Sequence, residues 1–335
     1  MPSRPVRTVT GAAVLLSLIV PGLLGATTTA AAARPVSSSS GSTAPVYAHD
    51  FPDPAALTSS SAYYAYSTGS ATTGTNLQVM SSSSLTSWAG PPTEALPWLP
   101  KWATVGSTWA PAVIQIGTSY LMYYTVRDTD LARQCISVAV SSSAGGPFKD
   151  NSSGPLVCDP HGSIDPSPIL VGTSLYLVWK SDDNSVGATP HLWSEPLASN
   201  GMSLAPNTSP SELLSPSVTW QGNLIEGPSM VAVPGSADFD LFYGANAWDS
   251  SNAGIGYAVC STPSGPCTNK STKAAWMATN ASVQKNGPSG PSVFQDANGV
   301  HIAYHAWGNV IGYPSGARQL WIDSLSFSGT TPYVG

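Results

Sequence analysis

Apolar and polar positions alternate along this chain in units that restate one pattern. In each of five segments a proline precedes a short apolar run, a turn follows, and an aromatic-rich run comes next. Short apolar runs that are bounded by turn residues and rich in aromatic side chains predict β-strands rather than helices. The prolines that mark the five segments are Pro54, Pro111, Pro166, Pro228 and Pro291.

The spacing of these marker prolines indicates a repeat architecture. Successive markers lie 55 to 63 residues apart, and a further strand-like run closes most units, as at 136–140 and 255–259. Three or four strands per unit at such a period are typical of a β-propeller, whose blades bury their faces against one another around an axis. The sequence therefore predicts an all-β, five-bladed β-propeller that forms a single domain over residues 47–335. Two packed sandwich domains are the alternative, but a sandwich has no reason to repeat the proline pattern.

Composition supports this fold class and limits the partners. The chain has 31 Gly and 30 Pro among 335 residues, and only 9% of its residues are charged, which suits many turns and few helices. The net charge is −6 and no basic cluster is present, so nucleic acid is not an expected partner.

The N-terminal region is typical of an exported protein. Arg4 and Arg7 precede an apolar stretch at 12–24, and small residues follow at 31–33, which together predict a secretory signal peptide over residues 1–33. Residues 34–46 are rich in Ser, Pro and Ala and predict a linker. We expect a secreted, extracellular and monomeric mature protein without a membrane segment.

The sequence also indicates how the predicted propeller begins and ends. Residues 47–50 precede the first marker and are expected to pair into the last blade as an extra strand. The fifth unit ends close to Gly335, so neither an appended sandwich domain nor a carbohydrate-binding module is expected.

Four cysteines suit an oxidising compartment and permit three pairings. We favour Cys135–Cys158 and Cys260–Cys267, because each pair closes a local loop. A metal site is a weaker interpretation, since the chain has no Cys-x-x-Cys motif with a nearby pair of histidines.

Three acidic residues stand at nearly the same point of the repeat. Asp53, Asp165 and Glu226 each come just before a marker proline, in a chain with only 18 acidic residues. At the inner ends of the blades they would meet on the axis; Trp109-Ala110 and Ser289-Gly290 hold the other two positions. A single Asp-Pro can be a structural turn, but three acids on one rim favour acetal cleavage, which needs a protonated and an ionised carboxyl group. Such a set titrates as a coupled system.

The motifs around these acids resemble those of glycoside hydrolase family 43, a family of five-bladed propellers that act on arabinose- and xylose-containing glycans. The resemblance spans the whole predicted mature chain and rests on several short motifs in order: 51–54, 108–111, 163–167, 225–229, 304–307 and 317–320. It implies that Asp53 is the general base, that Asp165 raises the pKa of the acid and orients it, and that Glu226 is the general acid. It also implies inversion at the anomeric carbon.

The resemblance extends to residues around the acids. It implies that Arg318 hydrogen-bonds sugar hydroxyls, with a solvated strand arginine as the alternative. It implies that His305 helps to hold a structural calcium ion on the axis, mostly through water, with an ordinary core histidine as the alternative. No cofactor is expected for the chemistry itself. Trp109 and Trp102 could stack on sugar rings, although Trp102 could equally pack between blades.

These observations predict a secreted inverting glycosidase that releases terminal pentose residues from arabinan, arabinoxylan or xylo-oligosaccharides. An α-L-arabinofuranosidase, a β-D-xylosidase or an enzyme with both activities is the first choice, because the two sugars present similar hydroxyl patterns. An endo-1,5-α-L-arabinanase is the second choice. A non-catalytic sugar-binding propeller is the alternative of another class, but it would have no need for all three carboxylates.

Overall fold

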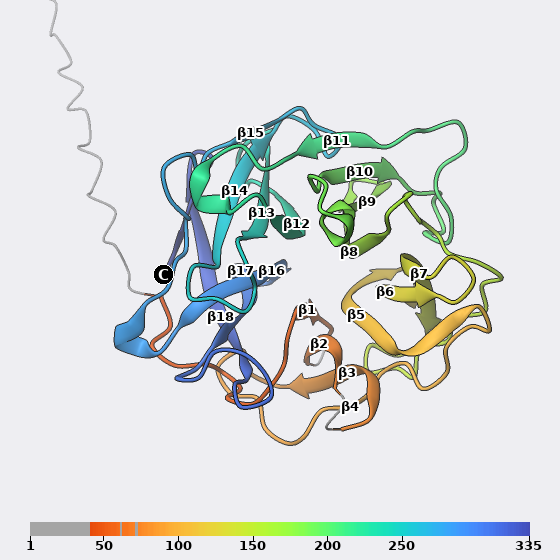
Figure 1. Cartoon of the computed structure of the whole chain (residues 1–335), viewed down its shortest axis with the longest axis horizontal. Helices are drawn as coiled ribbons and strands as arrows, with labels where there is room; N and C mark the ends of the chain where they lie inside the picture. The colour runs from red at the N-terminus through yellow and green to blue at the C-terminus, as the bar shows by residue number, and fades with distance from the viewer. Residues whose placement is uncertain (1–40, 61, 71–72) are drawn as a thin grey trace, which may run out of the picture. The chain divides into compact units, whose positions relative to one another are not determined.

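Regular structure in this chain is almost entirely antiparallel β-sheet, arranged around a common axis (Figure 1). The computed structural model describes residues 41–60, 62–70 and 73–335, so the predicted signal peptide and residues 34–40 of the predicted linker lie outside the described residues. Within the described part, no helix is long and apolar enough to cross a membrane. The prediction of an all-β, five-bladed propeller is confirmed.

Each blade runs from an inner to an outer strand. Blade 1 contains β1 (Ala55–Thr58), β2 (Tyr63–Ser70), β3 (Thr75–Ser82) and β4 (Thr93–Glu94). Blade 2 contains β5 (Ala103–Ile116), β6 (Ser119–Asp128) and β7 (Arg133–Ser141). Blade 3 contains β8 (Ser163–Val171), β9 (Ser174–Ser181), β10 (Leu192–Pro196) and β11 (Ser211–Leu214).

Blade 4 contains β12 (Ile225–Ala232), β13 (Phe239–Ala245), β14 (Gly254–Cys260) and β15 (Cys267–Asn269), and blade 5 contains β16 (Asn286–Asp296), β17 (Gly299–Trp307), β18 (Arg318–Ser328) and β19 (Thr331–Val334). Short 3-10 turns occur at Asp183–Val186, Thr219–Gln221 and Ala281–Val283. Blade 2 has three strands, and isolated bridges from Ile136 to Val157 and from Val140 to Lys149 take the place of its outer strand.

The first strand of every blade faces the axis. β1, β5, β8, β12 and β16 each contact the next first strand around the ring, and β16 contacts β1. In blades 2 to 5 the marker proline lies inside a register shift of this strand, as Pro166 does between Ile164 and Ser167. Proline has no N–H to give to a ladder, so it is tolerated at such a bulge, and bulges commonly redirect side chains beside active sites.

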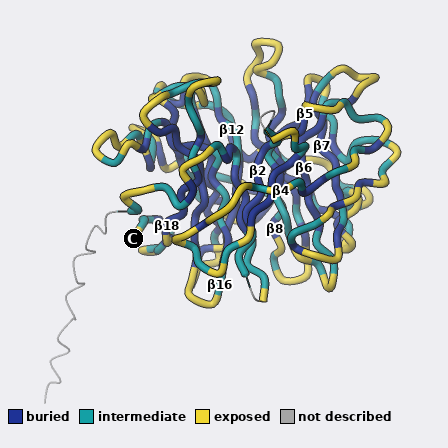
Figure 2. The backbone as a smooth tube through the Cα atoms, turned by 90° about the horizontal axis from the view of Figure 1, so that it is seen from below, coloured by how far each residue is buried: buried dark blue, intermediate teal, exposed yellow. Residues whose placement is uncertain are grey.

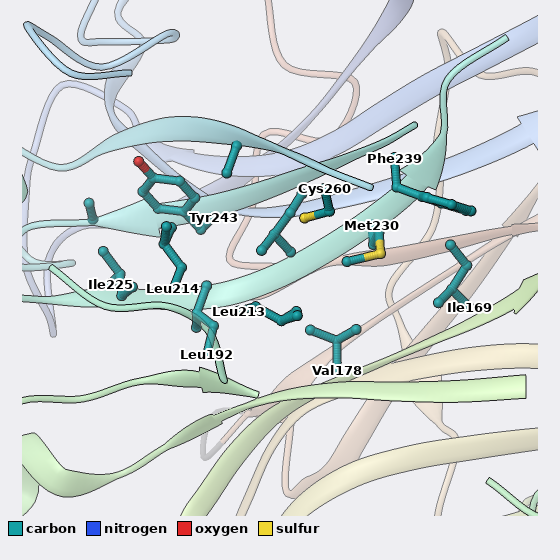
Figure 3. Close-up of a cluster of buried hydrophobic side chains, with 13 residues drawn as sticks. Ile169, Val178, Leu192, Leu213, Leu214, Ile225, Met230, Phe239, Tyr243 and Cys260 are labelled. Atoms are coloured by element: carbon teal, nitrogen blue, oxygen red, sulfur yellow. The ribbon is translucent and has the colours of Figure 1, made fainter. Parts of the chain in front are cut away.

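Apolar side chains fill the seams between blades. Among the described residues, five hydrophobic clusters occupy the five seams of the ring. Figure 3 shows the seam between blades 3 and 4, where Val178 and Leu192 of blade 3 pack against Met230 and Tyr243 of blade 4. The strands are therefore buried and the loops exposed, as Figure 2 shows. This packing explains the repeat, because each blade buries its faces only against its neighbours.

The ring closes by pairing the N-terminal strap (residues 46–51) with β18. Val46 N–H donates to the carbonyl oxygen of Leu320 at 2.9 Å, and Phe51 N–H donates to that of Arg318 at 2.8 Å. β19 continues the same edge of β18 from Leu325 onward. The expected pairing with the last blade is confirmed, although it consists of an isolated bridge between Tyr47 and Leu320 rather than a regular strand. Ser42 already bonds to Asp323, so the chain joins blade 5 before the predicted linker boundary at residue 46.

Both predicted disulfides are present. Cys135–Cys158 joins β7 to the segment that leads to β8, and Cys260–Cys267 joins β14 to β15. Within the described chain no cysteine remains free.

Candidate active site

The residue before each marker proline adopts an unusual backbone conformation. Its φ is 51° at Asp53, 43° at Ala110, 56° at Asp165, 54° at Gly227 and 59° at Gly290. Non-glycine residues seldom adopt positive φ, and Asp is among those that tolerate it best. Asp53 and Asp165 therefore hold equivalent ring positions, but the expected equivalence of Glu226 is wrong. Glu226 comes one residue earlier, because Gly227 occupies the turn.

The three predicted catalytic acids line one cavity of about 620 Å³ on the propeller axis. All five inner strands contribute to its wall, through residues 53–55, 109–112, 164–167, 226–229 and 289–292. Lys180, Trp248 and Arg318 also line it. A second hollow of about 750 Å³ lies between residues 45–50 and blade 1, but none of the three acids reaches it. The axial cavity is thus the place where these acids can act together.

Asp53 is held by two contacts to its carboxylate and one to its backbone. Arg318 Nη1 donates to Oδ1 at 3.0 Å, and Thr68 Oγ1 donates to Oδ2 at 2.6 Å. The backbone N–H of Asp53 donates to His305 Nδ1 at 3.0 Å. Thr68 also accepts the backbone N–H of Ala110 at 2.9 Å, which ties the ring position of blade 2 to blade 1.

These contacts favour the ionised form of Asp53. Burial alone would raise the pKa of this carboxyl, but the Arg318 guanidinium and the Thr68 hydrogen bond outweigh it and lower the pKa below its ordinary value. An ionised carboxylate that accepts hydrogen bonds can take a proton from water. The geometry therefore suits a general base.

Asp165 is fixed by backbone contacts. Its own N–H donates to Thr125 Oγ1 at 3.0 Å, in the way that Ala110 donates to Thr68 one blade earlier. Asp165 Oδ2 accepts the N–H of Gly227 at 2.9 Å. This bond links the turn of blade 3 to the turn of blade 4 and brings Asp165 close to Glu226.

A buried lysine stands beside Glu226. Lys180 comes from the end of β9, and its side chain is 1% exposed. Its Nζ lies 3.7 Å from Glu226 Oε2 and 3.5 Å from Asp182 Oδ1. One ammonium group therefore serves several carboxyl groups.

Asp165 and Glu226 hold protons more strongly than ordinary carboxylic acids. Burial and the nearby Glu226 raise the pKa of Asp165 to about 7, although Lys180 opposes the shift. Burial also raises the pKa of Glu226, again against Lys180 and with help from the Asp53 charge. Two interacting carboxyls titrate as a pair. Around neutral pH the pair can retain a proton for a leaving group, while Asp53 is ionised.

The other predicted substrate contacts divide into two groups. Trp109 is 38% exposed and lines the cavity. Arg318 also lines it, but only 9% of its surface is exposed, so the alternative of a solvated arginine is wrong. Trp102 lies outside the cavity wall and packs in the seam between blades 1 and 2, where its Nε1 donates to Ser152 Oγ at 3.0 Å.

His305 does not fit direct coordination of calcium. Its Nδ1 accepts the Asp53 N–H, so a neutral ring carries its proton on Nε2, which cannot then offer a lone pair to a cation. Burial and the Arg318 charge lower the pKa of His305 to about 3, although the Asp53 charge opposes this shift. The ring is therefore neutral. Nε2 is buried and has no hydrogen-bond partner in the described chain. The described residues also contain no cluster of three or more metal-binding side chains.

Sequence reasoning missed several residues of this site. Thr68 and Lys180 contact the acids, and Trp248 and Tyr313 contact Arg318. None of the four stands in the proline pattern. A signal was available only for Lys180, which ends an otherwise apolar strand at 175–180 and would be costly to bury without partners.

Comparison with known proteins shows the family to which the chain belongs. A family model described as glycosyl hydrolases family 43 matches residues 42–332, whereas no curated protein matches the chain. A thermostable family-43 glycoside hydrolase of known structure shares 26% identity at a TM-score of 0.74, over 85% of this chain and 92% of that one.

Two further structures share the fold. An endo-1,4-beta-xylanase from Bacteroides thetaiotaomicron is 24% identical at a TM-score of 0.73, over 87% of this chain and 96% of its own. An alpha-L-arabinofuranosidase from Lactobacillus brevis is 17% identical at a TM-score of 0.68, over 88% of this chain and 95% of its own. The family match covers nearly the whole described propeller, and this chain therefore belongs to glycosyl hydrolases family 43.

Proposed function

We propose that this glycoside hydrolase inverts the anomeric centre and releases terminal pentose residues, as an α-L-arabinofuranosidase, a β-D-xylosidase or both. The observation that carries the proposal is the asymmetry of the axial cavity. One carboxylate, Asp53, is held ionised by Arg318, while Asp165 and Glu226 retain a proton as a pair. A glycosidase needs one carboxyl group in each of these states, and inversion is proposed from the resemblance of the motifs to the family.

The proposed roles follow from the two environments. Asp53 accepts a proton from the water that attacks the anomeric carbon. Glu226 donates its proton to the glycosidic oxygen as that bond breaks, and Lys180 then lies beside the new carboxylate. Asp165 keeps the pKa of Glu226 high and fixes the turn at Gly227 through its Oδ2. Both protons are accounted for, and no cofactor enters the reaction.

The proposed substrates are arabinan, arabinoxylan and xylo-oligosaccharides. Family membership supports a glycan, and the similar structures include an endo-1,4-beta-xylanase and an alpha-L-arabinofuranosidase. Exposed Trp109 offers a ring face on which an apolar sugar face can stack. An endo-arabinanase is the second candidate, and an endo-arabinase is among the proteins of similar structure.

A product profile distinguishes these candidates. The purified protein is incubated with linear arabinan, arabinoxylan and aryl pentosides, and the products are separated by chromatography. We expect monosaccharide release from the first minutes, whereas early oligosaccharides would indicate an endo-acting enzyme. On the two polysaccharides, Glu226→Gln, purified identically, reports any contaminating activity. An absence of sugar release from all three substrates would contradict the proposed substrate class.

We also propose that the mature protein is secreted as a monomer. The N-terminal sequence and the two disulfides support export to an oxidising compartment. N-terminal sequencing of protein recovered from culture medium tests the predicted processing near residue 33. Light scattering of the same sample tests the monomer.

A further inference from the structure

The Arg318 guanidinium is constrained well beyond its bond to Asp53. Its Nε donates to the Tyr313 hydroxyl at 3.1 Å, while Nη1 donates to Asp53 Oδ1 at 3.0 Å. Its Cζ lies 4.9 Å from the centre of the Trp248 ring and 5.6 Å from that of Tyr313. A guanidinium is planar and rigid, so two fixed donors and two ring contacts leave it one orientation. The direction of Nη1 toward Asp53 is thereby set.

Tyr313 has both of its hydrogen-bonding functions occupied. Its hydroxyl accepts from Arg318 and donates to Asp50, whose Oδ1 lies at 2.8 Å and Oδ2 at 3.0 Å. Burial raises the pKa of the Tyr313 phenol, so the hydroxyl remains a donor over the working pH range. Tyr313 also packs against the rings of Trp307 and Trp248, with centres 5.1 and 6.1 Å away.

Asp50 connects this contact chain to the strap that closes the ring. Its Oδ1 also accepts the backbone N–H of Arg318 at 2.9 Å, at the start of β18. The next strap residue, Phe51, donates its N–H to the Arg318 carbonyl at 2.8 Å. The backbone that carries Asp50 and Asp53 is therefore bonded to the residue that orients the Asp53 carboxylate.

We propose that Asp50 and Tyr313 are positioning residues for the catalytic base, which act through Arg318 to hold the Asp53 carboxylate ionised and in place. This inference rests on the proposed function of Asp53. It adds that the strap contacts that close the propeller also align the catalytic base. Arg318 then has a role that does not depend on contact with a sugar.

Tyr313→Phe tests the proposal, because it removes one hydroxyl and keeps the ring against Trp248 and Trp307. Without its Nε partner the guanidinium can turn away from Asp53, and the pKa of Asp53 then rises toward its ordinary value. We expect kcat to fall about 10- to 100-fold with little change in KM. The acidic limb of the kcat/KM profile should move upward by roughly one pH unit.

Matched variants separate positioning from a general loss of structure. Tyr333→Phe, in the outer strand of blade 5, should leave the profile of the wild type in place. Asp50→Asn keeps an acceptor oxygen and should move the acidic limb less than Asp50→Ala does. The inference is wrong if Tyr313→Phe keeps the wild-type acidic limb, or if its only effect is a higher KM.

The proposed function can fail separately. If the wild-type enzyme releases its product with retained configuration, Asp53 is not a water-activating base, and the proposed function fails with this inference. If the wild type inverts and Tyr313→Phe leaves the acidic limb unmoved, the proposed function stands and only the positioning role is lost.

Discussion

The two sides of the axial cavity each pair partly buried carboxyl groups with a buried cation, yet they reach opposite protonation states. On the side of blades 5 and 1, Arg318 bonds to Asp53 at 3.0 Å, and the pKa of Asp53 is lowered. On the side of blades 3 and 4, Lys180 lies 3.7 Å from Glu226, and the pKa of Glu226 is raised.

The difference lies in how the cation is shared. Arg318 gives one donor to Asp53 and has its orientation fixed by Tyr313 and Trp248. Lys180 is a single ammonium group that faces Glu226 and Asp182 and influences Asp165. One well-placed cation offsets the burial of one carboxylate, whereas one shared cation does not offset the burial of several. The different contacts of the two cations thus separate base from acid.

The largest expected effect comes from the acid side. Glu226→Gln cannot donate a proton to the leaving oxygen, and we expect kcat/KM on natural glycans to fall about 10²- to 10⁴-fold. An aryl pentoside with a strongly acidic phenol needs little protonation, so its hydrolysis should suffer much less. Steady-state kinetics on both substrates check the prediction. Equal losses on both would contradict a role of Glu226 as general acid.

Replacing Lys180, the shared cation, should have a smaller effect on activity than replacing Glu226. Lys180 lowers the pKa of Glu226 and of Asp165, so Lys180→Met should raise both and move the basic limb of kcat/KM upward, by about one pH unit. The measurement is the pH dependence of kcat/KM.

A second buried lysine provides the matched control for Lys180. Lys285 lies 3.9 Å from Asp323 and bonds to Tyr304 at 2.7 Å, in blade 5 and outside the cavity wall. Lys285→Met should lower the melting temperature and leave the basic limb unmoved. A basic limb that stays put in Lys180→Met, or moves downward, would contradict the account.

Asp240 shows what burial does where the neighbouring cation makes no hydrogen bond. Both of its carboxyl oxygens are buried without a hydrogen-bond partner in the described part of the chain. Burial and the Asp238 charge raise its pKa to about 7, although Lys270 opposes the shift. The folded protein therefore binds this proton more tightly than the unfolded chain does, and the associated stability is lost as pH rises from about 4 to 7.

Asp240→Asn should remove this pH-dependent loss. The amide has nearly the shape of the protonated carboxyl but does not ionise. We expect its melting temperature to exceed that of the wild type by about 2–5 °C at pH 8 and to match it near pH 4. Calorimetry at the two pH values is the measurement. An equal shift at both would show that ionisation of Asp240 is not the cause.

Much of the fold could be predicted because the marker prolines recur once in each blade, at the same place in its inner strand. Each blade buries its faces only against its neighbours, so the same local solution recurs, and Pro111, Pro166, Pro228 and Pro291 all fall inside bulges of inner strands. The acids before the prolines were visible for the same reason. The one-residue offset of Glu226 stands in the sequence as Glu226-Gly227-Pro228, but its structural reason does not, since it depends on the positive φ of Gly227.

The supporting residues could not be predicted because they come from other strands and loops. Tyr313 reaches Arg318 from the loop between β17 and β18, and Lys180 ends a second strand rather than a first one. Their roles depend on distances across blades, which a repeat pattern does not encode. The tautomer of His305 depends likewise on one contact, with the backbone N–H of Asp53.

The stereochemistry of the released sugar shows whether Asp53 activates water or attacks the sugar. Proton NMR of the anomeric signals during the first minutes of hydrolysis of an aryl pentoside distinguishes the two configurations before mutarotation. We expect the first product to have the configuration opposite to that of the substrate, because Asp53 activates water rather than attacking the sugar. A first product with retained configuration would contradict the assignment of base and acid to the two sides of the cavity.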